Sequence, residues 1–546
     1  MTSPFHFRVD LPGESRLLRV EPERFELPVS EILYAHGILL NTRCGGQGVC
    51  DGCEVELLGG TVIDLDTRRP LNAGTAPMRL RACRSQFVPA GDVAIRVPAQ
   101  SLATHEPLAT TEFRIRVPFA HEPLFEGHLA AAIDVGTTSV TVAIVDLGDG
   151  ALLAVKSAPN AQSRWGQDVL SRISCCQRDR QAVAALQQAI SRTTIRPLID
   201  QCLDERGAGC QELAGATVAG NTVMLHLLAG EDPTSLGRAP FDPVFLDHRV
   251  LSAKAIGLAG RGFPNDQPIH LLPSASAYVG ADIVAGAIAT GLAYRQEPCI
   301  LLDLGTNGEI ILKHGRKSFA CATAAGPAFE GTGLTCGMIA SRGAVSRVRL
   351  ATASAAIELE VIGNERPRGI CGSAYIDLLA EGRRTGLIDR HGRLRFDDAA
   401  GFRPLRDCAG GETALRIAVD AHERPIVITE GDIAALLQAK AAIAAGALTL
   451  LERCAMDAGD VRDAFVAGAF GTHLDPDHAV DIGLLPAGLR GRVEAVGNTS
   501  LAGAYMAALD RQVLDDLERC ARDVEVVELN FDKHFESRFI DQLLLP

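Results

Sequence analysis

Residues 131–146 read Ala131-Ala132-Ile133-Asp134-Val135-Gly136-Thr137-Thr138-Ser139-Val140-Thr141-Val142-Ala143-Ile144-Val145-Asp146. Apolar runs on both sides of an Asp-x-Gly-Thr turn predict two strands joined by a tight connection. The same unit returns at 299–312, around Asp303-Leu304-Gly305-Thr306-Asn307. A second unit, Gly-Asn-Thr after an apolar run, also occurs twice, at 220–222 and 497–499. Units repeated in this order predict two similar α/β lobes related by a pseudo-twofold axis.

The repeated turns predict a phosphate site. Backbone N–H groups of a glycine turn can surround phosphate oxygens, and threonine hydroxyls add donors. The residues expected to contribute are Gly136, Thr137 and Thr138 from one lobe, and Gly305, Thr306 and Asn307 from the other. We expect Asp134 and Asp303 to face each other across a cleft, where a carboxylate pair suits Mg²⁺. Glu309 could orient an attacking water, although it also begins a strand.

A third glycine cluster lies in Phe465–Gly471, where Gly468 and Gly471 follow an apolar run and could approach a purine and its ribose. The chain has neither a Walker A sequence nor a Gly-x-Gly-x-x-Gly after a strand, which excludes P-loop and Rossmann nucleotide sites. The sequence therefore predicts an ATP site between two lobes of another type.

The N-terminal region contains four cysteines, Cys44, Cys50, Cys53 and Cys83. Their spacing is close to the plant-type pattern of a [2Fe–2S] cluster. Zinc sites usually carry two Cys-x2–4-Cys pairs, and only one is present. Disulfides are not expected in a large acidic chain without a signal peptide. Glycines within the loop permit the positive φ angles and close backbone approach that wrapping a cluster needs.

The flanks of these cysteines predict a small β-rich domain. Alternating residues 5–21 around a Pro-Gly turn indicate a hairpin, Ser30 is expected to cap a helix over 31–35, and 54–58 reads as a strand. We expect a β-grasp ferredoxin-like domain over 1–97 and a proline-rich linker over 98–127. Either a swinging linker or one bound to the body fits the composition. An ATPase domain follows over 128–546, with lobe 1 over about 128–298, lobe 2 over about 299–546, and the last helices free to return to lobe 1.

Length and composition restrict the function. The chain has 546 residues, 47% hydrophobic and 22% charged, so several structural units are expected. A net charge of −14 argues against nucleic-acid binding. Residues 433–451 are apolar but include Gln438 and Lys440, which predicts a buried helix and no membrane association. The N-terminus lacks a signal-peptide pattern, so we expect a cytoplasmic protein.

Taken together, these motifs resemble the actin, sugar kinase and Hsp70 superfamily. The stretch from Ile133 matches its first phosphate motif, that from Leu302 its second, and Val466–Gly471 its adenosine motif. With an N-terminal four-cysteine loop, the chain resembles the reductive activators of corrinoid-dependent enzymes. Further similar stretches are Gly220–Met224 with Pro240-Phe241, Pro273–Gly280, Ala325–Gly331 with Gly326 as a nucleotide contact, and Gly369–Ser373.

The resemblance implies a two-part protein, a β-grasp [2Fe–2S] ferredoxin domain followed by a two-lobed, ribonuclease H-like ATPase domain. It implies ATP-dependent delivery of one electron from the cluster to Co(II) of a corrinoid protein, regenerating Co(I) for a methyltransferase or demethylase. The absence of flavin and nicotinamide motifs implies an external low-potential electron donor. Three alternatives remain: a sugar or acyl kinase with a redox sensor, an electron carrier with a regulatory nucleotide fold, and an acyl-CoA dehydratase activator. Monomer and homodimer are both open.

Overall fold

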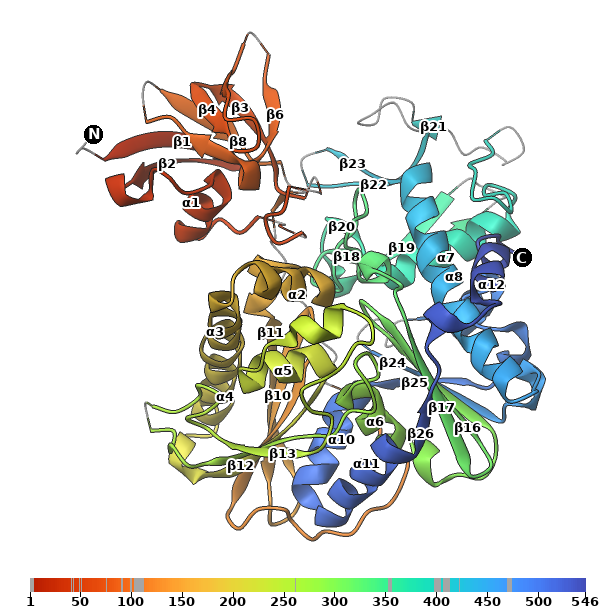
Figure 1. Ribbon diagram of the computed structural model, residues 1–546. Helices are drawn as coiled ribbons and strands as arrows, with labels where there is room; N and C mark the ends of the chain where they lie inside the picture. Colours follow the sequence, from red (N-terminus) through yellow and green to blue (C-terminus); the bar gives the residue numbers. More distant parts are fainter. Residues whose placement is uncertain are drawn as a thin grey trace. The chain divides into compact units, whose positions relative to one another are not determined.

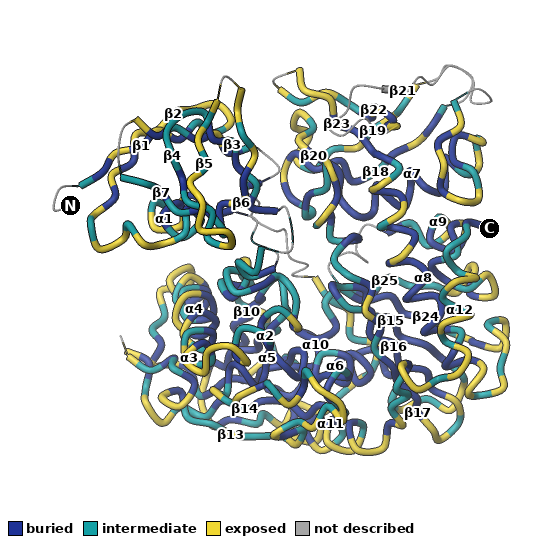
Figure 2. Tube along the Cα trace, turned by 45° about the horizontal axis from the view of Figure 1, so that its top comes forward, coloured by how far each residue is buried: buried dark blue, intermediate teal, exposed yellow. Residues whose placement is uncertain are grey.

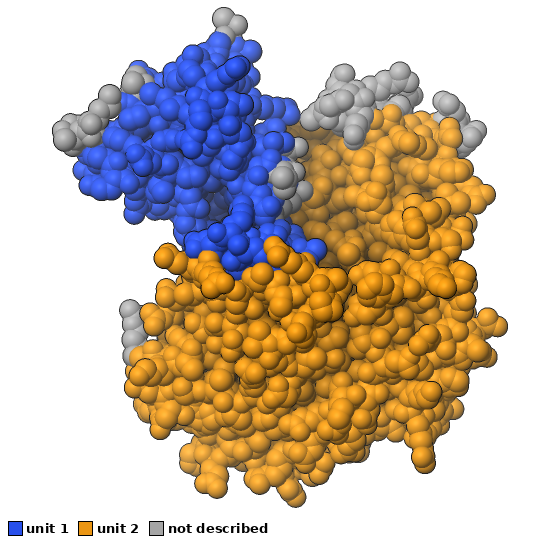
Figure 3. Space-filling view, in the orientation of Figure 1, with its two compact units in different colours: residues 1–105, 161–179 blue, residues 106–160, 180–546 orange. Residues whose placement is uncertain are grey.

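The computed structural model describes residues 4–546 except 41, 43, 49, 51, 75, 90–91, 99–100, 103–111, 261, 352–355, 397–403, 406–412, 422 and 469–473. The chain forms two compact units (Figure 3). Unit 1 comprises 1–105 and 161–179, and unit 2 comprises 106–160 and 180–546. We describe each unit separately.

Unit 1 is built on a mixed sheet with strand order β2-β1-β8-β3-β6. Its strands are β1 (Phe5–Leu11), β2 (Glu14–Val20), β3 (Glu54–Gly59), β6 (Met78–Arg81) and β8 (Val93–Arg96). The predicted hairpin is β1–β2, and β1 also pairs in parallel with β8. A second small sheet joins β4 (Thr61–Asp64), β5 (Pro70–Asn72) and β7 (Ser85–Phe87).

Helix α1 (Val29–Ala35) packs Val29, Ile32 and Leu33 into the core of unit 1. The helix was expected to begin at residue 31, capped by Ser30, but it begins two residues earlier, at Val29. Pro28 occupies the N-cap position, where no side chain is hydrogen-bonded as a cap. Proline has no N–H to leave unsatisfied and its fixed φ favours entry into a helix, so it can begin α1 without a capping hydroxyl.

Unit 1 also includes residues 161–179, which the sequence placed in lobe 1 of the ATPase. This segment contains helix α2 (Val169–Arg178), and Arg164 forms an ion pair with Glu31 of α1. The Arg164 guanidinium lies 4.4 Å from the centre of the Tyr34 ring. Charge pairing and cation–π contact, neither visible as a local sequence pattern, associate this segment with the N-terminal sheet.

Unit 2 contains the two predicted lobes, each built on one sheet (Figure 1). The lobe 1 sheet has the order β11-β10-β9-β12-β14-β13, and the lobe 2 sheet β25-β24-β15-β16-β17-β26. The lobe 1 strands are β9 (Leu129–Val135), β10 (Ser139–Asp146), β11 (Leu152–Pro159), β12 (Leu213–Gly220), β13 (Arg249–Ser252) and β14 (Pro268–Leu271). The lobe 2 strands are β15 (Cys299–Leu304), β16 (Gly308–His314), β17 (Lys317–Thr323), β24 (Asp463–Ala467), β25 (Val493–Gly497) and β26 (Val524–Val526).

The two Asp-x-Gly-Thr units occupy equivalent places in the two sheets. In each lobe the unit forms an antiparallel hairpin, β9–β10 or β15–β16, and its first strand pairs in parallel with β12 or β24. The Gly-Asn-Thr units are not equivalent, contrary to the prediction. The first follows β12, which lies beside β9, whereas the second follows β25, which β24 separates from β15. Asn221 and Asn498 each cap the helix that follows, so this motif recurs because it is a local strand-to-helix turn.

Helices complete unit 2. Lobe 1 contains α3 (Gln181–Gln188), α4 (Arg196–Asp204), α5 (Thr222–Ala229) and α6 (Ala281–Ala289); lobe 2 contains α7 (Gly372–Arg384), α8 (Glu430–Arg453) and α9 (Pro476–Asp481). Of the last helices, α10 (Thr499–Leu509) and α11 (Arg511–Asp523) pack against α6, and α12 (Phe535–Gln542) packs against α8. The Thr217 hydroxyl of β12 donates to the Ala504 carbonyl of α10 at 2.7 Å, which joins α10 to the lobe 1 sheet.

Smaller strands lie on the outer part of lobe 2. They are β18 (Ala344–Ala351), β19 (Ala356–Val361), β20 (Gly369–Ile370), β21 (Pro404–Leu405), β22 (Ala414–Val419) and β23 (Pro425–Thr429). Strands β15, β16 and β24 are coloured as buried in Figure 2, in agreement with their apolar sequences. The central hairpin of lobe 2 is therefore covered on both faces.

Helix α8 is long and apolar enough to cross a bilayer by length and composition. Most of it is buried in lobe 2, as the sequence predicted for 433–451. Lys440, which is fully buried, donates from Nζ to the Leu544 carbonyl at 2.7 Å. A buried, internally satisfied lysine is typical of a core helix.

The predicted linker divides between the units: Leu102 forms a β-bridge with Leu40 in unit 1, whereas residues 112–127 are bound to unit 2. Arg114 N donates to the Val496 carbonyl at 3.2 Å, Arg116 N to Ala289 at 2.9 Å, and Leu124 N to Ala508 at 3.0 Å. These bonds favour the alternative of a bound linker for residues 112–127. The earlier linker residues 99–100 and 103–111 lie outside the described residues.

Candidate functional site

The four cysteines come together in unit 1 as two hydrogen-bonded pairs, Cys44 with Cys50 and Cys53 with Cys83. The bond from Cys83 lowers the pKa of the Cys53 thiol to about 7, and the same bond raises the pKa of Cys83. Across the described residues, no three histidine, cysteine or acidic side chains are arranged to hold one metal ion. A two-and-two arrangement is instead what a binuclear cluster with two ligands on each iron needs.

Backbone amides face the cysteine sulfurs. The Gly48 amide hydrogen-bonds to Cys83, and the Gly52 amide to Cys50. Gly48 has φ +75°, and a Cβ there would lie 2.7 Å from the Arg84 side chain. Amide donors to sulfur stabilise thiolates and tune the potential of a bound cluster. The loop therefore fits a [2Fe–2S] cluster in donor type, pairing and amide environment.

In unit 2 the two Gly-Thr turns meet. The Thr138 and Thr306 hydroxyl oxygens are 3.1 Å apart, and each hydroxyl donates to Glu330 Oε2 at 3.0 Å. Glu330 ends a 3-10 helix, Pro327–Glu330, which follows Gly326 with its φ of +75°. Turns from separate lobes, 168 residues apart in sequence, thus face one point.

Carboxylates gather beside this point. Asp134 is the next-to-last residue of β9, Asp303 lies on β15, and Glu309 on β16 pairs in register with Asp303. Burial is the largest cause that raises the pKa of Asp303 to about 8, and the charges of Asp282, Asp134 and Glu330 contribute the rest of that shift. Burial also raises the pKa of Glu309 well above its usual value, with contributions from Asp282 and Asp303. Mutual repulsion of this kind shows that these acids share one poorly solvated region.

Asp134 differs from Asp303 in having two hydrogen-bond donors. Asn498 Nδ2 donates to Asp134 Oδ2 at 2.8 Å, and Ser500 Oγ donates to Oδ1 at 2.7 Å. Burial raises the pKa of Asp134, and both donors oppose that shift. Asp134 is therefore fixed in orientation by residues that start α10.

The third glycine cluster lies beside Asp303. Gly468, with φ +95°, follows β24, and a Cβ there would come within 2.6 Å of the Leu304 carbonyl and 2.9 Å of Asp303 Oδ1. Only glycine permits this contact. Gly471, the other predicted residue of this cluster, lies outside the described residues.

Comparison with known proteins identifies the family. Residues 297–546 match the family described as the C-terminal domain of RACo, the ASKHA domain, and residues 129–295 match the RACo middle region. The chain is 33% identical over 423 residues to the corrinoid activation enzyme RamQ of Eubacterium limosum, covering 75% of this chain and 69% of that protein. The chain belongs to the family of reductive activators of corrinoid proteins.

Two further similarities agree with this assignment. The activator is 28% identical over 335 residues to a [Co(II) methylated amine-specific corrinoid protein] reductase of Methanosarcina barkeri, covering 56% of this chain and 58% of that protein. It resembles a solved structure titled reductive activator for corrinoid,iron-sulfur protein, with a TM-score of 0.72 and 28% identity over 99% of this chain and 98% of that one. The activator is thus a multidomain α/β enzyme with a C-terminal ASKHA domain.

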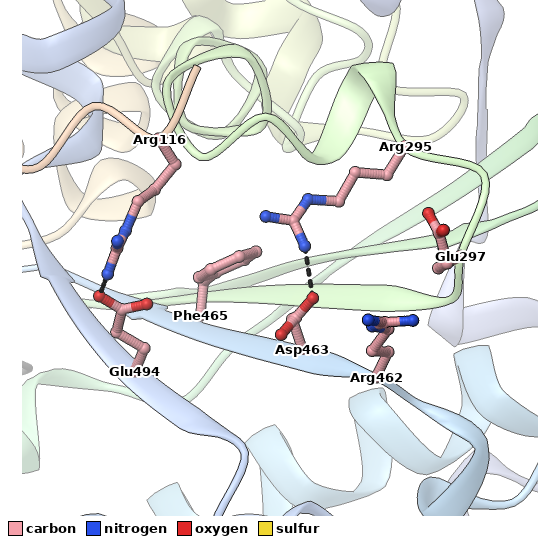
Figure 4. A pocket seen from close by; sticks show the side chains of 7 residues that line it. All are labelled: Arg116, Arg295, Glu297, Arg462, Asp463, Phe465 and Glu494. Carbon is pink, nitrogen blue, oxygen red and sulfur yellow. Dashed lines mark hydrogen bonds and ion pairs between the residues drawn. The ribbon is translucent and has the colours of Figure 1, made fainter.

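The activator also contains a polar pocket of about 480 Å³, which Figure 4 shows from close by. It is lined by Arg116, Arg295, Glu297, Arg462, Asp463, Phe465 and Glu494. Asp463 begins β24 and Glu494 lies near the start of β25, whereas Gly468 follows the end of β24. The pocket therefore lies at the starts of β24 and β25, and the acidic cluster lies toward the opposite ends of the strands in this sheet. Its charges are largely paired, since Arg295 contacts Asp463 and Arg116 contacts Glu494.

Sequence reasoning missed several residues in and around the activator's acidic cluster. Asp282 starts α6 and carries a pKa that burial raises to about 6, yet no motif marked it. Asn498 was noted only as part of the repeated Gly-Asn-Thr unit, and neither Ser500 nor Glu330 was predicted as a nucleotide-site residue. The available signal was position, because each lies at a helix end next to a glycine-rich stretch.

Proposed function

We propose that this protein transfers one electron from an N-terminal [2Fe–2S] cluster to Co(II) of a corrinoid protein, giving Co(I), with hydrolysis of ATP to ADP and phosphate. The observation that carries the proposal is the meeting of Thr138, Thr306 and Glu330 beside paired carboxylates, in a chain of the corrinoid activator family. An external low-potential donor supplies each electron. The cluster, when bound, supplies one-electron transfer.

In this proposal the ferredoxin-like unit holds the cluster through its four cysteines. Cys44 and Cys50 bind one iron, and Cys53 and Cys83 the other, following the two hydrogen-bonded pairs. The mixed sheet, with α1 packed into the same core, supports the ferredoxin assignment. The Gly48 and Gly52 amides stabilise negative charge on the sulfurs.

The nucleotide is assigned to the cleft of unit 2. We expect backbone N–H groups of the turns at 136–138 and 305–307 to bind phosphate oxygens, and Gly468 to lie against the nucleoside. Asp134 and Asp303 suit Mg²⁺, which takes one or two protein carboxylates with phosphate and water completing its shell. Glu330, between the two turns, is better placed than Glu309 to orient the attacking water, because Glu309 pairs with Asp303 on the adjacent strand.

The need for ATP follows from redox arithmetic. A plant-type [2Fe–2S] centre lies near about −400 mV. If reduction of the cobalt requires a potential lower by roughly 100–200 mV, the unfavourable free energy is about 2.3–4.6 kcal/mol, because 59 mV corresponds to a tenfold change for one electron. Closure of two lobes around a nucleotide can provide that energy if the closed and open states bind the corrinoid partner differently.

The direct test mixes the reduced activator with a Co(II) corrinoid protein and follows the cobalt spectrum with and without Mg-ATP. Co(I) should accumulate only with Mg-ATP. Glu330→Gln should abolish the ATP effect, whereas the control Glu297→Gln, in the pocket at the starts of β24 and β25, should keep it. ATP-independent Co(I) formation would instead indicate an electron carrier with a regulatory nucleotide fold.

A second test addresses the cluster. Cys83→Ser should remove the visible absorption of a binuclear iron centre, and Cys175→Ser, a cysteine without metal-type spacing, should leave it intact. Purified wild-type protein with one zinc and no iron would contradict the assignment. ATP turnover that depends on a small hydroxyl or carboxyl substrate, and not on a corrinoid protein, would favour the kinase alternative.

A further inference from the structure

The Asp134 carboxylate accepts hydrogen bonds from two residues in the C-terminal part of the chain. Its two donors, Asn498 and Ser500, lie 364 and 366 residues further along the chain. The Asn498 side chain has a second bond, because its Oδ1 accepts from Leu501 N at 2.8 Å and so caps α10. Asn498 therefore links the Asp134 carboxylate rigidly to the start of α10.

The linker contacts the same turn. Asn498 N donates to the Glu112 carbonyl at 3.1 Å, and Phe113 forms a β-bridge with Gly497. Gly497 has φ +74°, and a Cβ there would lie 2.3 Å from the Glu112 carbonyl oxygen. The close approach of linker and turn therefore requires glycine at 497.

The linker continues along α10 to its end. The Phe113 and Tyr505 rings are 5.5 Å apart, the Leu124 amide donates to the Ala508 carbonyl at 3.0 Å, and Arg511 N donates to Glu122 O at 3.0 Å. Arg116 forms an ion pair with Glu494 near the start of β25, at the edge of the pocket in Figure 4. Residues 112–124 contact α10 at both of its ends and in its middle, so we expect the two segments to move together.

We propose that Asn498 and Ser500 are positioning residues for Asp134, and that residues 112–124 set the place of these two donors by pairing with Gly497. This inference rests on the proposed function. A nucleotide with Mg²⁺ at Asp134 would depend on Asn498, whose backbone N–H also donates to Glu112 of the linker. The linker is the chain that connects the N-terminal unit to the ATPase. Asn498 bonds to both Asp134 and the linker, so it couples nucleotide binding to the position of the linker. The nucleotide-bound and nucleotide-free proteins then differ in the energy of their linker contacts.

The first test compares Gly497→Ala with Gly491→Ala in the full-length protein. Both glycines have nearly the same φ, +74° and +73°, but a Cβ at 491 would have nothing within 4 Å. Both variants therefore carry the same backbone strain, and only Gly497→Ala displaces the linker. We expect Gly497→Ala to reduce ATP-dependent Co(I) formation by about tenfold relative to Gly491→Ala, in line with small misplacements at catalytic groups.

Hydrogen exchange gives a readout that does not depend on activity. In Gly497→Ala the Arg114 and Asn498 amides should exchange faster, and Mg-ADP should no longer protect residues 112–124. Equal Co(I) formation and equal exchange in the two glycine variants would overturn the inference. If wild-type protein forms no Co(I) with ATP but Mg-ADP still protects the linker only when Gly497 is present, the proposed function fails and the coupling stands.

The second test separates positioning from general stability. Ser500→Ala should raise the KM for Mg²⁺ at saturating ATP by about tenfold, at an unchanged unfolding temperature. Ser500→Thr, which keeps the hydroxyl, should have the wild-type KM for Mg²⁺. Asn498→Ala should raise the KM for Mg²⁺ as much as Ser500→Ala does. An unchanged KM for Mg²⁺ in both alanine variants would overturn the positioning role.

Discussion

Nucleotide binding should release a proton from Asp303. Burial, followed by the charge of the neighbouring Asp282 carboxylate, raises the pKa of this carboxyl to about 8. With that pKa, about nine tenths of the Asp303 population is protonated at pH 7. A carboxyl must be ionised to bind a metal. We therefore expect Mg-ADP binding to release about 0.9 proton at pH 7, and the apparent affinity to rise about fivefold from pH 7 to pH 8 and to level off above pH 9.

Calorimetric titration of Mg-ADP in two buffers of different ionisation enthalpy measures the released proton directly. Asp282→Asn removes the neighbouring charge that raises the pKa of Asp303 most. The pKa of Asp303 should therefore fall, and fewer protons should be released on binding. The control Asp463→Asn changes an acid in the ion pair with Arg295 at the start of β24 and should release as many protons as wild type. Proton release near zero for wild type at pH 7 would refute a buried, protonated Asp303 as a magnesium ligand.

Two further predictions concern stability. The Tyr375 hydroxyl is buried and has no hydrogen-bond partner within the described part of the chain, so Tyr375→Phe should raise the free energy of unfolding by about 1–3 kcal/mol. The control Tyr505→Phe loses a 2.6 Å hydrogen bond to the Gly150 carbonyl and should lower the free energy of unfolding by about 0.5–1.5 kcal/mol in urea titrations. A lower free energy of unfolding in both variants would contradict the argument. His478 Nδ1 lies 2.7 Å from Asp377 Oδ1, which raises the pKa of His478, so its contribution is full below about pH 6.5 and is lost as pH rises through the folded value. His478→Gln should therefore lower the unfolding temperature more at pH 6 than at pH 8.5, and equal losses would speak against the ion pair.

Local chemistry explains what the sequence could predict. The Asp-x-Gly-Thr turns are defined within a few residues, because apolar strands and a glycine turn specify a hairpin without reference to the rest of the chain. The same holds for the β1–β2 hairpin and for the buried helix over 433–451. The Gly-Asn-Thr repeat was misinterpreted for the same reason. Its asparagine caps a helix at either place, so the motif reports a local turn and not an equivalent position in the two sheets.

The rest of the cleft depends on contacts between distant segments. Asp282 reaches Asp303 only because α6 begins where the two lobes meet, and Asn498 reaches Asp134 across 364 residues. Nothing near Asp282 distinguishes it from an ordinary acid in the first turn of a helix, which is favourable there for local electrostatic reasons alone. The two Asp-x-Gly-Thr turns also differ in a way that only the fold reveals, because Asp134 has two hydrogen-bond donors while Asp303 faces further acids. If both aspartates bind the same ion, Asp134, whose charge is stabilised by two hydrogen bonds, should anchor it, and Asp303 should join only when it loses its proton.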